Sequence, residues 1–409
     1  MTTQPLLDAA GRRRGLRTVM ATTFLMHAGF FLIIPLLSVH YVDDLGWAAA
    51  FIGVVLAVRQ FMQQGLTVFG GALADRLGAK GLIMAGLLIR SVSFVVMGFA
   101  ATPAVLLLSG ALAAVGGALY DAPQKAAIAA LATVEEMPAY YAQTGVLSNI
   151  AQSVGPLIGA LLIRLDFQVV GLAAAGFFFA AFLIIWWRLP AVAVSTHKQA
   201  VGKGLKLALS DRPFVTFTLL MMGFWFMWVQ LSIAMPLAVT GLTHDERSIA
   251  ILFTVNSVIA IVLQGPALRL AQRFLSPLPI LIVGVLFMAL GLGTVAWAHQ
   301  LGQFYLSVFF FALGTVLASP NYQTLAAALA NPAARGSYMG VNSLALALGG
   351  GLGHVTGGAL VDQAAALHWP ALPWMVFALV GVLAAMGLTR FYLRQRVMIG
   401  RRPSTMNVD

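Results

Sequence analysis

Residues 167–187 read FQVVGLAAAGFFFAAFLIIWW, an apolar run that carries no charged side chain. A helix needs about 20 such residues to cross the hydrocarbon core of a bilayer, so this run predicts a transmembrane helix. The whole 409-residue chain has the same character, because 60% of its residues are hydrophobic and only 9% are charged. A soluble domain averages roughly 25% charged residues. The chain is therefore predicted to be an all-α integral membrane protein.

Twelve apolar runs follow one another along the chain, with short loops between most of them. The predicted spans are 17–39, 47–70, 82–101, 104–123, 140–163, 167–187, 213–236, 247–268, 278–298, 302–324, 338–361 and 372–393. The one long connection is basic and lies at the midpoint, so it predicts a linker between two six-helix bundles. The predicted domains are a cytoplasmic N-terminal tail (1–16), an N-terminal bundle (17–187), a cytoplasmic linker (188–212), a C-terminal bundle (213–393) and a cytoplasmic tail (394–409).

The basic residues predict the orientation of these spans. If the N-terminus is cytoplasmic and the chain alternates, 20 of the 24 Lys and Arg residues fall on the cytoplasmic side. The outer loops instead hold Asp43, Asp44, Asp166, Asp245, Glu246 and Asp362. Cytoplasmic loops of membrane proteins carry an excess of Lys and Arg, so both termini are predicted to be cytoplasmic. This distribution accounts for the net charge of +11 without a nucleic-acid partner.

The two halves of the chain repeat one pattern. The fourth span ends in Tyr-Asp-Ala-Pro at 120–123, followed by an Ala-rich stretch and a Gly-rich helix around 155–161. The tenth span ends in Ala-Ser-Pro-Asn at 318–321, followed by an Ala-rich stretch and a Gly-rich helix around 353–360. Repeats of six helices give two halves related by an axis along the membrane normal, with a central cavity whose access alternates. The repeat therefore indicates that the protein functions as a transporter.

The loop between the second and third spans carries a recognisable motif, GALADRLGAK at 71–80. Its Gly71, Asp75, Arg76, Gly78 and Lys80 resemble the loop motif of the major facilitator superfamily. A carboxylate there can meet the positive end of a neighbouring helix. Such a contact forms in one conformation and breaks in the other, which predicts a conformational switch. The alternative is a capped, charged loop without a switching role.

A second motif lies in the fifth span, where Gly155, Pro156 and Gly159 resemble the helix 5 motif of the drug/proton antiporter family. Proline removes a backbone hydrogen bond from this helix, and the glycines allow close helix packing. The stretches 59–65 and 335–340 are similar to multidrug resistance transporters of the MdtH type. The resemblance extends over about residues 25–390.

The resemblance implies a major facilitator fold in a bacterial inner membrane. It further implies proton-linked export of drugs, with fluoroquinolones among the substrate types of the family. No catalytic constellation, nucleotide-binding loop or metal-ligand spacing is present in the sequence, so neither an enzyme nor a bound cofactor is predicted. The predicted partners are a small-molecule substrate, protons and membrane lipid, and the protein is expected to be a monomer.

Ionisable groups at membrane depth are functional candidates because they are expensive to bury there. Among the acids, Asp121 is the one that falls within a span, so it is the leading candidate for proton coupling. The alternative for Asp121 is a structural pair near the helix end with Lys125 or Arg76. His27 is the second proton-coupling candidate, because a histidine titrates near neutral pH. Its alternative is a hydrogen bond to a backbone carbonyl.

Further polar and aromatic residues within the spans predict the texture of a small-molecule site. The substrate-cavity candidates are Arg59, Gln63, Arg90, Asn149, Gln152, Trp225, Trp228, Gln230, Asn256 and Asn342. A guanidinium group suits recognition of a substrate carboxylate. The alternatives are hydrogen bonds between helices for the polar residues and lipid contact or core packing for the aromatic ones.

Two departures from the family pattern bear on the substrate. The fourth span has Ser109-Gly110 where antiporters often carry an arginine, and the first span has Thr22-Thr23 where MdtH-type proteins carry an acid. The predicted cavity is therefore basic, which fits neutral, zwitterionic or anionic substrates. The predicted function is export of small amphipathic molecules in exchange for protons. The alternative is a uniporter or importer of an organic anion or other small solute on the same fold.

Overall fold

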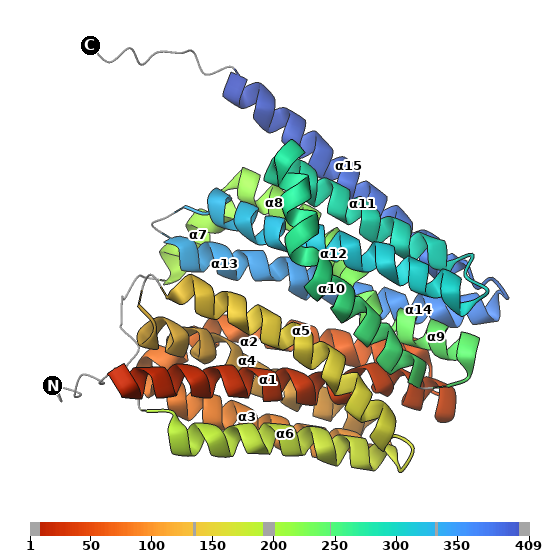
Figure 1. Cartoon of the computed structure of the whole chain (residues 1–409), viewed down its shortest axis with the longest axis horizontal. Helices are drawn as coiled ribbons and strands as arrows, with labels where there is room; N and C mark the ends of the chain where they lie inside the picture. The colour runs from red at the N-terminus through yellow and green to blue at the C-terminus, as the bar shows by residue number, and fades with distance from the viewer. Residues whose placement is uncertain (1–8, 134–135, 191–200, 246, 332–333, 401–409) are drawn as a thin grey trace.

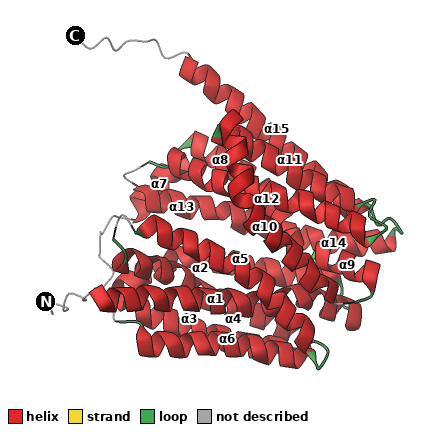
Figure 2. Ribbon diagram, viewed as in Figure 1, coloured by secondary structure: helices red, strands yellow, loops and turns green. Residues whose placement is uncertain are grey.

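The computed structural model describes residues 9–133, 136–190, 201–245, 247–331 and 334–400. The regular secondary structure within these ranges is helical throughout (Figure 2). Within the described ranges, twelve helical segments are long and apolar enough to cross a membrane. The predicted fold class, a twelve-helix membrane protein, is confirmed.

The first half of the chain forms six long helices. They are α1 (Ala9–Val39, continued by a π-helical turn at His40–Asp44), α2 (Ala49–Leu77), α3 (Ala79–Gly98), α4 (Pro103–Leu131), α5 (Met137–Leu162) and α6 (Phe167–Arg188). Within the segment predicted as a linker, the structure adds a short helix, α7 (Val201–Ser210).

The second half supplies six more spans, two of which are interrupted. The seventh consists of α8 (Arg212–Trp228), a 3-10 turn (Val229–Ser232) and α9 (Ala234–Thr243); the eighth to tenth are α10 (Arg247–Phe274), α11 (Pro277–Val295) and α12 (Leu301–Leu329). The eleventh consists of α13 (Arg335–Leu344), a π-helical turn (Ala345–Gly350) and α14 (Gly351–Ala366), and the last is α15 (Leu372–Gly400).

Three of the helices begin with side-chain caps that the sequence encodes. The Thr102 hydroxyl accepts a hydrogen bond from the Val105 N–H at the start of α4. The Asp166 and Asp211 carboxylates accept from backbone N–H groups at the starts of α6 and α8. Such caps satisfy donors that have no partner inside the helix. Each cap therefore fixes the residue at which its helix begins.

The two halves of the chain pack as two groups of helices. Figure 1 shows α1 to α6 together on one side of the molecule and α8 to α15 on the other. α1 begins and α15 ends on the same side of the molecule (Figure 1). We call the opposite side the distal end. α2 packs against α14, and α5 packs against α10, so these pairs join the two groups.

Glycine contacts repeat between the halves at a constant offset. A Cβ atom on Gly86 of α3 would lie 2.6 Å from the carbonyl oxygen of Gly116 in α4. A Cβ atom on Gly284 of α11 would lie 2.8 Å from the carbonyl oxygen of Gly314 in α12. Both second-half glycines lie 198 residues after their first-half counterparts, close to the spacing of the sequence repeat. The backbones meet at the same place in each bundle because neither helix carries a side chain there.

The same offset relates two further contacts. A Cβ atom on Gly155 of α5 would lie 2.8 Å from the Ala28 carbonyl oxygen in α1. One on Gly353 of α14 would lie 2.7 Å from the Phe226 carbonyl oxygen in α8. Ala28 and Phe226 are also 198 residues apart. The repeat therefore preserves which helices touch and at which residue.

Helix α4 is longer than predicted. The expected span ended at residue 123, whereas α4 continues through Pro123 to Leu131. The Ala-rich stretch after the proline has high helix propensity, which offsets the hydrogen bond that Pro123 cannot donate. Asp121 consequently lies inside a continuous helix rather than near its end.

Candidate functional site

A cavity of about 400 Å³ lies between the two bundles. Side chains from both halves surround it. The lining consists of Met26, His27, Phe30, Phe31, Arg59, Gln60, Gln63, Gln64, Arg90, Asp121, Ser148, Asn149, Gln152, Phe224, Trp225, Trp228, Asn256, Ala260, Phe311, Ala312, Thr315, Ser319 and Leu346. Aromatic walls with a few convergent polar groups are typical of small-molecule sites.

The cavity gathers most of the residues that the sequence singled out. Both proton-coupling candidates line it, as do eight of the ten substrate-cavity candidates. Gln230 and Asn342 lie outside this lining. The Gln230 Nε2 atom donates to the carbonyl oxygens of Phe226 and Gly353, each at 2.9 Å, and so ties α8 to α14. The Asn342 carbonyl oxygen accepts from the Tyr322 hydroxyl at 3.5 Å.

A hydrogen-bonded chain links an arginine to the cavity carboxylate. Arg59 Nη1 donates to Gln63 Oε1 at 2.9 Å, and Gln63 Nε2 donates to Asp121 Oδ2 at 2.8 Å. Arg59 and Gln63 are four residues apart on α2, so their side chains share one helix face. Gln63 is well suited to this position because an amide offers both an acceptor and a donor. The charges of Arg59 and Asp121 are therefore coupled through one neutral side chain.

Arg90 of α3 is held by weaker partners. Its side chain is 2% exposed, its Nε lies 3.4 Å from the Ala113 carbonyl oxygen, and its Nη1 lies 2.7 Å from the Met26 sulfur. The guanidinium carbons of Arg59 and Arg90 lie 4.8 and 5.7 Å from the centre of the Phe30 ring. Two guanidinium groups thus flank one aromatic ring on the cavity wall. Cation–π contact stabilises such cations but does not neutralise them.

His27 of α1 points one ring nitrogen at its own helix. Its Nδ1 atom lies 2.8 Å from the Thr23 carbonyl oxygen, so Nδ1 carries a proton and donates. In the neutral ring the other nitrogen, Nε2, is then an acceptor. The backbone contact that was the alternative for His27 is thus present, and the histidine also lines the cavity.

The loop motif between α2 and α3 is only partly described. The surroundings of Gly71 and the side chains of Asp75 and Arg76 lie outside what the structure describes, so the contacts of these residues stay a prediction. Gly78 has a φ of 82°, a conformation that glycine adopts without strain. Lys80 Nζ donates to the Trp186 carbonyl oxygen at 2.9 Å, which joins the start of α3 to the end of α6.

The motif of the fifth span lies against the first span. Gly155 and Gly159 of α5 face the backbone of α1 near Ala28 and Leu32, with no room for a side chain. Pro156 lies between them without breaking α5, which runs from Met137 to Leu162. This seam closes one side of the N-terminal bundle next to His27 and Phe31.

The two bundles are bonded together at the distal end. The Asp362 carboxylate of α14 accepts from both the Ala49 and Ala50 N–H groups at the start of α2, at 2.9 and 2.8 Å. Two more hydrogen bonds cross between the bundles there, Ser38 to the Ser232 carbonyl at 3.0 Å and Thr240 to Asp43 at 3.2 Å. These contacts, which we call the distal lock, hold the helices together beyond the cavity.

The lining residues that no sequence pattern singles out are chiefly apolar. Met26, Phe30, Phe31, Phe224 and Phe311 line the cavity, yet their types are equally common on lipid-facing helix surfaces. Ser319 was detectable in principle, because it stands 198 residues after Asp121 in the repeat.

The chain is similar to known proteins over most of its length. The family model of the Major Facilitator Superfamily matches residues 19–245 and 225–405. The multidrug resistance protein MdtH of Sodalis glossinidius (strain morsitans) is 35% identical over 386 residues, which cover 94% of this chain and 95% of that protein. MdtH of Yersinia pestis (strain Pestoides F) is 35% identical over 391 residues, covering 96% and 98%.

Solved structures share the fold at low sequence identity. A POT family transporter in complex with 5-aminolevulinic acid superposes with a TM-score of 0.78 at 14% identity, covering 93% of this chain and 96% of that one. The nucleoside transporter NupG gives 0.76 at 14%, covering 92% and 98%. The human organic anion transporter MFSD10 gives 0.66 at 17%, covering 94% and 100%. These similarities concern the fold alone.

Proposed function

The chain belongs to the Major Facilitator Superfamily, and from this premise we propose that it exports small amphipathic molecules in exchange for protons. The relatives named as multidrug resistance proteins support export of drugs. The observation that carries the proposal is the coupling of one cavity carboxylate, Asp121, to Arg59 through Gln63. Asp121 is the one acid among the described residues of the cavity lining.

Asp121 is proposed as the proton carrier. When it is ionised, it accepts the Gln63 hydrogen bond and offsets the charge of the nearby guanidinium groups. Protonation removes that negative charge, so the cavity becomes more positive. A substrate amine beside Asp121 competes with the proton for the same carboxylate. This competition is what exchange requires, because one site then holds either a proton or a substrate cation.

The charge of the cavity supports a zwitterionic substrate. Arg59 and Arg90 suit a carboxylate, and Asp121 suits an amine. Trp225 and Trp228 lie on the opposite wall, where their aromatic side chains suit a flat apolar ring of the substrate. A molecule with all three features, as in fluoroquinolones, would bind across both halves. Its amine sets the direction of proton coupling, and its carboxylate contributes affinity.

The distal lock and the symmetry of the fold support transport by alternating access. In the proposed orientation both termini are cytoplasmic, so the distal end faces the outside of a bacterial inner membrane. With the distal lock formed, substrate enters from the cytoplasmic side. Its release requires the four lock bonds to break while contacts form at the other end. A proton gradient drives the cycle by loading Asp121 from outside.

Proteoliposomes with a pH-sensitive dye in the lumen test the proposal. Addition of a zwitterionic drug to the wild type should drive proton movement opposite to the drug, and Asp121→Asn should abolish it. Asp166→Asn is the matched control, because it removes one acid outside the cavity and asparagine still caps α6. Normal coupling in Asp121→Asn would remove Asp121 as the carrier.

A second function is favoured by the excess of cations in the cavity. Two guanidinium groups face a single carboxylate, so an organic anion without an amine also fits the lining. Protonation of Asp121 would then favour substrate binding, and substrate and proton would move together. The same liposome assay separates the two functions by the direction in which protons move relative to the substrate. Cotransport of an anion with protons would show that the protein acts as an importer and not as an exporter.

A further inference from the structure

A second pocket, of about 500 Å³, lies between the start of α1 and the end of α6. Four arginines surround it, and the described residues of its lining include no carboxylate. The lining residues are Arg13, Arg14, Arg17 and Arg188, with Ala10, Thr18, Ala21 and Ile184. We call this hollow the arginine pocket. Four cations around one space repel one another, so an anion bound there is favoured.

These charges come from two helices. Arg13, Arg14 and Arg17 lie on the described start of α1, and Arg188 lies in the last turn of α6. All four residues are exposed, and no acid lies in the described first turn of α1. An anion in the pocket would offset the repulsion among the four arginines.

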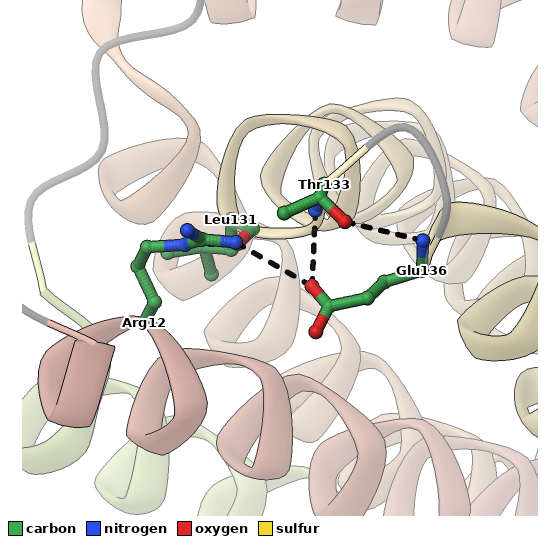
Figure 3. Close-up of polar contacts among 4 residues, drawn as sticks. All are labelled: Arg12, Leu131, Thr133 and Glu136. Atoms are coloured by element: carbon green, nitrogen blue, oxygen red, sulfur yellow. Dashed lines mark hydrogen bonds and ion pairs between the residues drawn. The ribbon is translucent and has the colours of Figure 1, made fainter.

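Arg12 shows what an arginine with protein partners looks like in the same turn. Its Nε donates to the Leu131 carbonyl oxygen at 2.9 Å, and its Nη2 lies 3.4 Å from the Glu136 carboxylate (Figure 3). Glu136 also accepts from the Thr133 N–H (Figure 3). Arg12 thus has a structural partner on the bundle. The four pocket arginines line the hollow, and no hydrogen bond or ion pair of their guanidinium groups is found within the described part of the chain.

Exposed aromatic residues indicate that the pocket lies at the depth of lipid headgroups. Trp186 and Trp187 directly precede Arg188 and are 53% and 74% exposed. Tryptophan is enriched where a span meets the membrane–water interface. Lys80 adds a further cation at this level, since its Nζ reaches the Trp186 carbonyl oxygen. The pocket therefore opens where lipid phosphates lie.

We propose that the arginine pocket binds the phosphate headgroup of an anionic phospholipid from the surrounding leaflet. The guanidinium groups supply bidentate donors for phosphate oxygens. The acyl chains would lie along the apolar surface of α6, beside Trp186. The lipid would bridge α1 and α6 at one end of the N-terminal bundle. Basic pockets between transmembrane helices are suited to this class of ligand.

Native mass spectrometry of the full-length protein in detergent tests the site. Phosphatidylglycerol is added to the wild type, to the pocket variant Arg13→Gln/Arg17→Gln/Arg188→Gln, and to a control variant. The control, Arg269→Gln/Arg273→Gln/Arg394→Gln, removes the same charge from exposed positions outside the pocket. Bound phosphatidylglycerol should fall at least tenfold in the pocket variant only. An equal fall in both variants would overturn the proposal.

Two competitors separate a lipid site from a general anion site. Phosphatidylcholine should bind at least tenfold more weakly than phosphatidylglycerol. Millimolar inorganic phosphate should leave the bound lipid in place. Displacement of the lipid by inorganic phosphate would assign the pocket to a soluble anion, and equal binding of phosphatidylcholine would remove the charge recognition.

A measurement on the folded wild type covers the case in which the pocket variant does not fold. Brominated phosphatidylglycerol should quench tryptophan fluorescence more than brominated phosphatidylcholine does. The double variant Trp186→Phe/Trp187→Phe should abolish that difference, because these side chains lie next to the pocket. Equal quenching by the two lipids in the wild type would contradict the proposal independently of any arginine substitution.

Discussion

In the N-terminal bundle the cavity wall carries two arginines, an aspartate and a histidine, whereas the described lining of the C-terminal bundle is aromatic, apolar or neutral polar. Because the two halves repeat, each lining residue of one half can be compared with its equivalent in the other half. His27 corresponds to Trp225, Phe30 to Trp228 and Asp121 to Ser319, each pair being 198 residues apart and each member lining the cavity.

The contacts between helices differ far less between the two halves than the side chains that line the cavity do. Gly86 and Gly284 contact equivalent helices, α4 and α12, in the two bundles. Gly155 and Gly353 likewise contact equivalent helices, α1 and α8. Backbone contacts tolerate no side chain, so they restrict substitution in both halves alike. Cavity positions face open space and are free to differ. One half is therefore able to specialise in charge and the other in apolar contact without a change of fold.

Transposing the acid is the strongest test of this division. The double variant Asp121→Ser/Ser319→Asp keeps the charge of the cavity but moves it to the equivalent position of the other half. Coupled transport should fall about 100- to 1,000-fold or more, because removal of a partner from a buried charge costs about 3–5 kcal/mol. The initial rate of drug-driven proton movement in proteoliposomes measures it. Rates within threefold of wild type would show that only the net charge matters.

Removing one guanidinium should have a smaller effect that depends on the substrate. Arg59→Gln should raise the KM for a zwitterionic drug about 10- to 100-fold, since a hydrogen bond to a charged group contributes about 1.5–3 kcal/mol. The methyl ester of the same drug should be little affected. The control is Ser257→Ala, at the equivalent position of the second half. Equal losses for acid and ester would mean that Arg59 is structural.

The sequence predicts the fold well because the bilayer requires about 20 apolar residues for each span. It predicts helix ends less well, as α4 shows by continuing past Pro123. Among site residues, Asp121 and Arg59 stand out because charge is rare in a span. Gln230 and Phe30 illustrate the limit, because an apolar helix does not reveal its rotation about its axis. Gln230 faces the α8–α14 seam, and Phe30 faces the cavity.

The shared framework predicts equal damage in the two halves. Gly155→Val and Gly353→Val should each lower the free energy of unfolding by about 1–3 kcal/mol, because the new side chain meets backbone that has no room to move. Gly145→Val in the same helix as Gly155 is the control, since nothing lies within 4 Å of a Cβ atom there. Thermal unfolding in detergent measures the change. Damage from only one of the two variants would contradict their equivalence.

The smallest expected effect concerns the distal lock, where the halves meet. Asp362 accepts two N–H groups at the positive end of α2, and asparagine keeps one acceptor but loses the charge. Asp362→Asn should therefore shift the equilibrium toward the distally open state by about 1 kcal/mol, roughly fivefold in population. Because the chain has no cysteine, spin labels at Leu45→Cys and Gly241→Cys report one distance without background labelling. Asp245→Asn, an exposed acid of the same half, should leave that distance distribution unchanged. If both variants shift it equally, the lock acts through surface charge and not through the cap on α2.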